Sequence, residues 1–180
     1  GTYLQQEALR LLGVTLAEGK SSTKSISLRK SKNLREGYKI QIHSQEVIIE
    51  AADEEGAFYG VISLLQLAHA AEVRRDNLSL PNWEIQDQPK YEWRGVMLDE
   101  SRYFFGMDKV KQLLDHMAYY KLNIFHWHLT DAPGWRIEIN GFPKLATVGG
   151  IGNESDPNAP ATYYTQEEIK EIVRYASERM

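Results

Sequence analysis

The spacing of apolar residues changes twice in the middle of the chain. The run Val96–Leu98 is short and wholly apolar, which predicts a strand buried on both faces of a parallel sheet. From Asp108 the apolar residues recur at helical spacing, and an extended run returns at 124–129. Parallel strands need a crossover of this kind between them, so the pattern predicts a βαβ unit.

Polar residues follow each of these predicted strands. Asp99 and Arg102 come after the first strand, and His126, His128 and Asp131 lie in or after the second. Because the parallel strands of a βαβ unit bring their carboxyl ends to one edge of the sheet, these side chains are expected to share a site there.

The first half of the chain predicts a small α/β layer, in which a helix packs on a sheet. Alternating apolar and polar residues at 38–43 and 47–51 predict a hairpin, and helical spacing follows at 56–71. A helix over 3–12 and a short strand at 26–28 are predicted before them.

A domain boundary is predicted near Tyr91. Pro81 and Pro89 frame an extended segment that suits a connector, because proline disfavours helix at the residue before it. We therefore expect an N-terminal α/β domain over 1–91 and a second domain over 92–180.

Two features are predicted in the last part of the chain. Residues 141–160 hold four glycines and three prolines, and a segment of this length predicts a functional loop rather than an ordinary connection. Thr165 and Glu168 form a capping-box pattern ahead of apolar residues at helical spacing, which predicts a last helix.

Composition narrows the class of ligand. The 180 residues are 42% hydrophobic and 26% charged, as in ordinary globular proteins, and the formal net charge is -4. Phosphate binding needs clustered positive charge, so this balance argues against a nucleic-acid or anionic-membrane partner. No apolar stretch approaches the roughly 20 residues of a membrane helix. The chain has no cysteine, which excludes disulfides and thiolate metal sites.

The second half contains three characteristic runs: RGVMLDESRYF at 94–104, YKLNIFHWHLTD at 120–131 and GWRIEINGFPKL at 134–145. They resemble the first barrel strand, the second barrel strand and the loop beyond it in the family-20 glycoside hydrolases, the β-N-acetylhexosaminidases. The first half, with YKIQI, VIIEA and FYGVISLLQL, is similar to the small α/β domain that precedes the catalytic barrel of that family.

The resemblance implies a TIM (β/α)8 barrel, of which residues 93–180 would form the first two βα repeats. A barrel needs roughly 250 residues, so we expect the chain to be part of a longer enzyme. The implied substrates are glycans or glycoconjugates ending in N-acetylhexosamine. We expect an exported bacterial protein, and self-association of the isolated chain through its open barrel edge.

The resemblance also implies a mechanism without a cofactor. In the family, the acetamido carbonyl of the sugar attacks its own anomeric carbon, with net retention, and an Asp-Glu pair of the fourth strand assists. That strand would lie beyond residue 180, so the chain alone is expected to be inactive. Asp53–Glu54 fits a helix-capping turn instead. Asp99–Glu100 lies at a strand end, but neighbours on a strand point to opposite faces, which argues against it as the acid pair.

Two residues match functional positions of the family, Arg102 a substrate-binding one and Asp131 a supporting catalytic one. Arg102 matches the arginine that donates hydrogen bonds to hydroxyls of the non-reducing sugar, and a salt bridge to Asp99 is its structural alternative. Asp131 matches the supporting aspartate that holds a histidine of the third repeat, and a turn role before Pro133 is its alternative.

Three other interpretations of the function remain open from the sequence. His126 and His128 share a strand face, as the metal ligands of barrel amidohydrolases do, although we predict packing roles for them and no metal site. An O-GlcNAcase-type hydrolase shares the mechanism, but its first barrel strand usually reads EGFYG where this chain has LDESRYF. The third interpretation is a folded α/β domain that binds sugar weakly or not at all.

Overall fold

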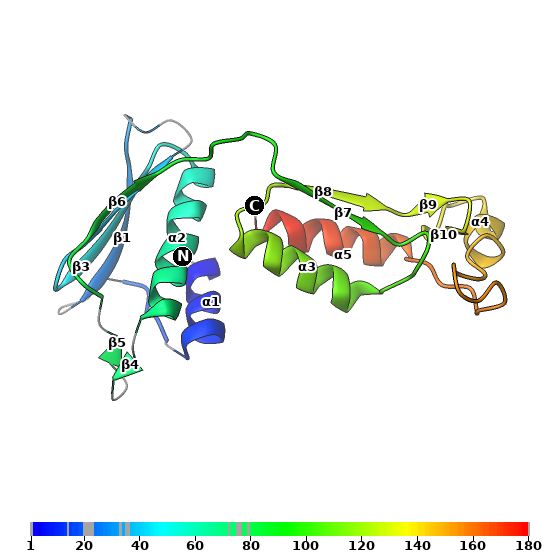
Figure 1. The fold of residues 1–180 in the computed structure, drawn as a ribbon, viewed down its shortest axis with the longest axis horizontal. Helices are drawn as coiled ribbons and strands as arrows, with labels where there is room; N and C mark the ends of the chain where they lie inside the picture. The colour runs from blue at the N-terminus through cyan, green and yellow to red at the C-terminus, as the bar shows by residue number, and fades with distance from the viewer. Residues whose placement is uncertain are drawn as a thin grey trace. The chain divides into compact units, whose positions relative to one another are not determined.

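The computed structural model describes residues 2–13, 15–19, 24–32, 34, 37–71, 73–74, 77–78 and 80–179. The chain divides into two compact units, Gly1–Glu92 and Trp93–Met180, each with a hydrophobic core (Figure 1). Among the described residues, no helix combines the length and the apolar character needed to cross a bilayer.

The first unit is a four-stranded sheet with one helix packed on it and a second helix beside the first (Figure 1). The strand order is β1 (Ser25–Lys30), β3 (Glu46–Ala51), β2 (Tyr38–Ile42) and β6 (Glu84–Asp87). β1 runs parallel to β3, whereas β2 is antiparallel to both of its neighbours. The helices are α1 (Thr2–Leu12) and α2 (Glu54–Ala70), and a short hairpin of β4 (Val73–Arg74) and β5 (Asn77–Leu78) follows them.

The core of this unit follows from the period-two pattern of β2. Tyr38, Ile40 and Ile42 are buried at alternate positions and belong to one cluster with residues of α2. Gly60 lets the helix approach the sheet, because a Cβ there would meet Ile49 Cγ2 at 2.5 Å. The predicted hairpin and both predicted helices are confirmed.

Two further predictions concern this unit, the capping turn at Asp53–Glu54 and the connector at Pro81–Pro89. The Asp53 side chain accepts a hydrogen bond from the Gly56 N–H at 2.7 Å, so the pair Asp53–Glu54 begins α2 as expected. The prediction that Pro81–Pro89 is a connector is wrong, because β6 pairs with β2 inside this segment. The two prolines stand outside the ladder, and the four residues of β6 keep their N–H donors.

The second unit is built on two parallel strands, β7 (Gly95–Asp99) and β8 (Ile124–His128). α3 (Met107–Tyr119) connects them, and α5 (Gln166–Ser177) lies beside α3 on the same face of the strand pair (Figure 1). Between β8 and α5 come the hairpin β9 (Thr130–Asp131) and β10 (Gly134–Trp135) and the short helix α4 (Pro143–Thr147). The order β7-α3-β8-α5 makes two βα repeats.

One face of this strand pair packs on the helices. Leu98 and Trp127 point to a core that includes Val110, Leu114 and Ile172. The prediction that the run Val96–Leu98 is buried on both faces is wrong, because Met97 is 56% exposed. α3 and α5 cover one face only, and within the described ranges no layer covers the other.

The segment before α5 is more regular than the sequence predicts. The predicted capping box is confirmed, because Thr165 Oγ1 accepts from the Glu168 N–H and the Glu168 carboxylate accepts from the Thr165 N–H. α4 was not predicted, and it lies inside the predicted loop 141–160 with Pro143 at its first turn.

Candidate functional site

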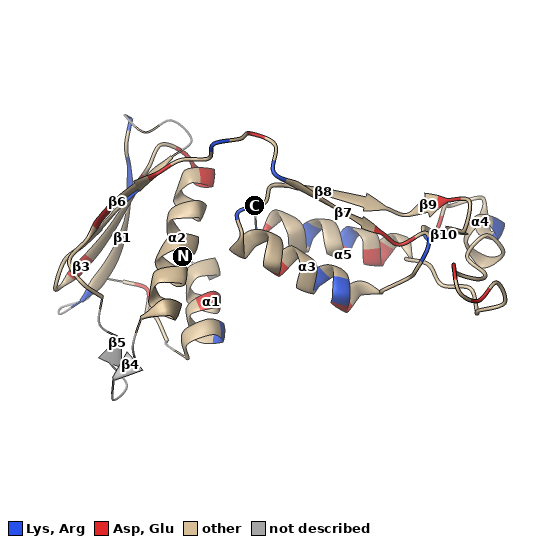
Figure 2. Ribbon diagram, viewed as in Figure 1, with Lys and Arg blue, Asp and Glu red and all other residues tan. Residues whose placement is uncertain are grey.

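The sequence-predicted polar residues meet at the carboxyl ends of β7 and β8. Parallel pairing places Asp99, the last residue of β7, opposite His128, the last residue of β8. Arg102 follows in the turn after β7, and Asp131 ends β9. Figure 2 shows the change of sign along the chain, with an acidic segment at the end of β7 and a basic one soon after it, before α3.

Arg102 joins two carboxylates through one nitrogen. Its Nη1 donates to Asp99 Oδ2 at 2.8 Å and to Asp131 Oδ2 at 2.6 Å. Within the part of the chain that the structure describes, its side chain has no other hydrogen bond, so Nε and Nη2 stay available to a ligand. The side chain is 39% exposed. The arginine is therefore held in place yet keeps a planar pair of donors.

Asp99 fixes this turn from the strand side. Its Oδ1 accepts from the backbone N–H groups of Ser101 at 3.0 Å and Arg102 at 3.2 Å. An aspartate side chain that accepts hydrogen bonds from the backbone N–H groups two and three residues further on commonly begins a turn. The salt bridge to Asp99, the structural alternative for Arg102, thus exists, and it is combined with a second one to Asp131.

Asp131 has three partners. Its Oδ1 accepts from the Ala132 N–H at 2.7 Å, and its Oδ2 lies 3.2 Å from His128 Nε2 in addition to Arg102. The Ala132 N–H, the His128 ring and the Arg102 guanidinium lower the pKa of Asp131 to about 2. Asp131 in turn raises the pKa of Arg102. The pair therefore stays charged throughout the ordinary pH range.

Glu100 does not face this site. Its side chain is fully buried and accepts from the Tyr164 O–H at 2.8 and 2.9 Å and from the Phe105 N–H at 3.1 Å. Burial raises the pKa of Glu100, and the Tyr164 and Phe105 hydrogen bonds oppose this rise. The Trp127 indole N–H also opposes the rise in the pKa of Glu100, although this N–H does not form a hydrogen bond with the carboxylate. Asp99 and Glu100 thus lie in different environments.

His126 and His128 lie on the open face of the strand pair. Their ring centroids are 5.6 Å apart, and His128 is the partner of Asp131 while His126 is exposed. In the described ranges no group of three His, Cys, Asp or Glu side chains is arranged to hold a metal ion.

Arg136 is the residue that sequence reasoning missed. It is fully buried and donates to backbone carbonyls before Arg102 and in the segment 150–162. Its neighbours in the run GWRIEI carry no signal of this, because its acceptors come from distant parts of the chain.

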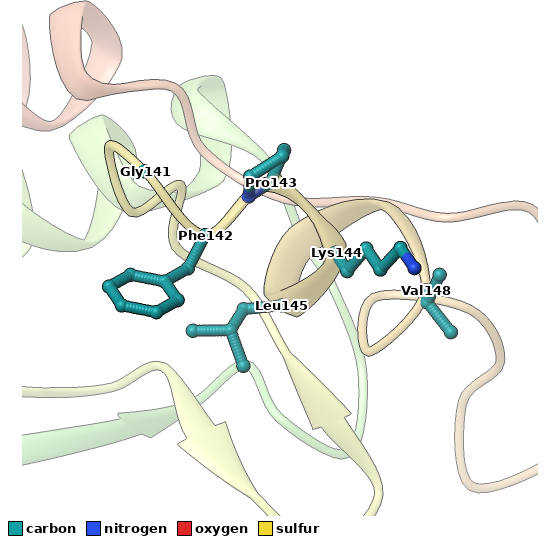
Figure 3. Close-up of a pocket in the computed structure, with 6 residues that line it drawn as sticks. All are labelled: Gly141, Phe142, Pro143, Lys144, Leu145 and Val148. Atoms are coloured by element: carbon teal, nitrogen blue, oxygen red, sulfur yellow. The ribbon is translucent and has the colours of Figure 1, made fainter.

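A second surface feature lies over α4, and Figure 3 shows its lining. Phe142 and Leu145 lie next to each other in this depression, with Lys144 and Val148 on the other side of the helix. Phe142 is 64% exposed and Val148 59%. Lys144 is the only charged residue among those that line it, so the depression offers apolar contact rather than acid-base chemistry.

Comparison with known proteins agrees with this architecture. The family model described as "Glycosyl hydrolase family 20, catalytic domain" matches residues 91–180, and "Glycosyl hydrolase family 20, domain 2" matches residues 1–88. A beta-hexosaminidase of Porphyromonas gingivalis is 42% identical over 149 residues, which are 80% of this chain and 19% of that protein. A beta-hexosaminidase of Vibrio furnissii is 39% identical over 86% of this chain and 26% of its own length.

The structural comparison covers nearly the whole chain. The crystal structure of a family-20 exo beta-N-acetylglucosaminidase from Vibrio harveyi, in complex with N-acetylglucosamine, superposes with a TM-score of 0.90 at 33% identity. The match covers 99% of this chain and 29% of that one. The chain therefore spans less than a third of the length of these relatives.

Proposed function

The chain belongs to glycosyl hydrolase family 20, and on this premise we propose that the whole protein is a retaining exo-β-N-acetylhexosaminidase. It would release terminal GlcNAc or GalNAc from glycans or glycoconjugates. The observation that carries the proposal is the Arg102 guanidinium, which two carboxylates hold at the strand ends with Nε and Nη2 directed to no protein acceptor in the described chain.

In this proposal Arg102 binds the non-reducing sugar. Neighbouring ring hydroxyls present oxygen acceptors at a spacing that the planar donors of a guanidinium match. Asp99 and Asp131 fix the orientation of the arginine before the sugar arrives, which reduces the entropy lost on binding. Asp131 is a supporting residue, and in the closed barrel it would also hold the histidine of the third repeat.

The chemistry itself would be substrate-assisted. The acetamido carbonyl oxygen forms a bond to the anomeric carbon while the glycosidic bond breaks, and a glutamic acid gives its proton to the leaving oxygen. Water then opens the oxazolinium ring with net retention. The Asp-Glu pair for these steps belongs to the fourth barrel strand, so residues 93–180 contribute sugar binding rather than proton transfer.

The test compares hydrolysis of 4-nitrophenyl N-acetyl-β-glucosaminide by the whole protein and by the 180-residue chain, each with and without a chelator. Turnover by the whole protein alone, unchanged by the chelator, is the expected result. Turnover by the short chain would contradict the assignment of the acid pair to the fourth strand. Loss of activity on chelation would instead favour a metal site at His126 and His128.

A further inference from the structure

Arg136 lies outside the Arg102 site but holds the backbone around it. We propose that Arg136 is a positioning residue, which sets Arg102 against Asp131 because its buried guanidinium fastens two segments and packs on the backbone of a third. The inference rests on the function proposed above, because it assigns Arg136 a role in the binding of sugar by Arg102. It does not make Arg136 a group that touches substrate.

The first segment is the turn that carries Arg102. Arg136 Nε donates to the carbonyl of Glu100 at 3.1 Å, and Nη2 donates to the carbonyl of Ser101 at 3.1 Å. These are the two residues directly before Arg102. The guanidinium therefore sets the course of the chain as it leaves β7 and enters the Arg102 turn.

The second segment is the loop that follows α4. Arg136 Nη1 donates to the Gly150 carbonyl at 2.6 Å, and Nη2 donates to the Gly152 carbonyl at 2.7 Å. The same loop returns to the site, because the Glu154 N–H donates to the Arg102 carbonyl at 3.0 Å. The backbone of Arg102 therefore lies between two segments that Arg136 binds. One is the turn before it, and the other is the loop that contacts its carbonyl.

The third segment is the hairpin that carries Asp131. The backbone N–H of Arg136 donates to the Leu129 carbonyl at 2.8 Å, which closes the hairpin across β9 and β10. Ser101 Oγ donates to the Gly134 carbonyl at 2.8 Å and ties the hairpin to the Arg102 turn. A Cβ on Gly134 would lie 2.5 Å from Arg136 Nη2, so the guanidinium packs directly on this backbone.

The residue type matters for this geometry. The acceptors surround a planar group whose donors point in fixed and diverging directions. A lysine at this position would keep the positive charge near the buried Glu100, but its single nitrogen could not reach the acceptors on both the Arg102 turn and the loop after α4. Arg136→Lys therefore loosens the positions of Arg102 and Asp131 and keeps the charge balance of the core.

The experiment is a double-mutant cycle in the whole protein. We would measure kcat and KM for 4-nitrophenyl N-acetyl-β-glucosaminide with Arg136→Lys, Arg102→Ala and both together. Arg174→Lys, on the exposed side of α5, is the matched control and should stay within twofold of wild type. Arg136→Lys should lower kcat/KM by about tenfold in the wild-type background and by less than twofold when Arg102 is already alanine.

The outcomes separate the two proposals. An equal loss from Arg136→Lys in both backgrounds would mean a general structural role and would overturn this inference alone. No loss in the wild-type background would overturn it too. Inactivity of the wild-type whole protein would overturn the proposed function and this inference with it. If Arg136→Lys does not fold, Thr162→Val enters the same cycle, since it removes one hydrogen bond of the Arg136 guanidinium, from Nη1 to Thr162 Oγ1 at 3.2 Å. A smaller loss with the same dependence on Arg102 is expected.

Discussion

Substitution of Arg102 by lysine is the most direct test of the site, and we expect it to lower kcat/KM by about 100-fold. Lysine retains the charge, but its nitrogen would be taken up by Asp99 and Asp131, whose oxygens both lie within 2.8 Å of the same arginine nitrogen. The donors Nε and Nη2, which we assign to the sugar, have no counterpart in lysine.

The magnitude follows from the number of donors lost. A hydrogen bond from a charged donor contributes roughly 1.5–3 kcal/mol, so two such bonds contribute about 3–6 kcal/mol. The side chain is 39% exposed, and competition with water favours the lower end of that range. About 3 kcal/mol corresponds to a little more than 100-fold. Bonds of equal strength in ground and transition states appear in KM, whereas bonds that strengthen in the transition state appear in kcat.

The assay uses initial rates of the whole protein on two substrates, the 4-nitrophenyl glycoside and an analogue with one ring hydroxyl replaced by hydrogen. Wild type should discriminate between them, and Arg102→Lys should discriminate less, because the partner of that hydroxyl is already lost. Arg174→Lys is the control for the same chemical change on an exposed surface. Activity of Arg102→Lys within threefold of wild type, with unchanged discrimination, would refute the assignment of Arg102 to the sugar.

Four further outcomes are expected. Asp131→Asn should lower kcat/KM by about tenfold. The pH profile above about pH 4 should not change, because the pKa of Asp131 is about 2 and its carboxylate is already charged there. A shifted profile would contradict this. Burial raises the pKa of Glu100, so wild type should lose stability as the pH rises above 4.5, the usual pKa of a glutamate. Glu100→Gln should lack this loss when urea midpoints are compared at low and neutral pH. Thr165→Ala should lower the free energy of unfolding by about 1 kcal/mol in urea titrations, because the capping box of α5 is lost. The isolated 180-residue chain should self-associate in sedimentation velocity, since each strand of the described β7-β8 pair has an unpaired edge, and a monomer at all concentrations would disprove this.

The longer elements of the second unit, β7, α3, β8 and α5, could be predicted because each depends on local periodicity. The helical stripe that includes Val110 and Leu114 identifies α3, and the extended run after it identifies β8. Parallel pairing of two such strands then brings Asp99 and His128 to one edge. The contact of Arg102 with Asp131 at 2.6 Å could not be predicted, because it depends on the turns after both strands.

Burial was harder to predict than secondary structure for a physical reason. An apolar run shows that a segment disfavours water, but the layers that cover it are decided by other parts of the chain. The run Val96–Leu98 is covered by α3 and α5 on one face only, so Met97 is exposed. The Pro81–Pro89 segment shows the converse, since its two framing prolines suggested a connector and a strand of the first sheet lies inside it.

The charged residues of the core show this limit most clearly. Lysine, arginine and glutamate are rarely buried, so a single sequence favours the surface for Glu100 and Arg136. Their burial is possible only because the polar atoms find partners in place of water. The Tyr164 hydroxyl is the partner of Glu100, and the carbonyls of Glu100 and Gly152 are among the partners of Arg136. A site at strand ends needs turns of defined position, and turns have few apolar contacts to hold them. One buried guanidinium with acceptors on several turns supplies that order, which is why the residue without a local signal is the one we expect to position Arg102.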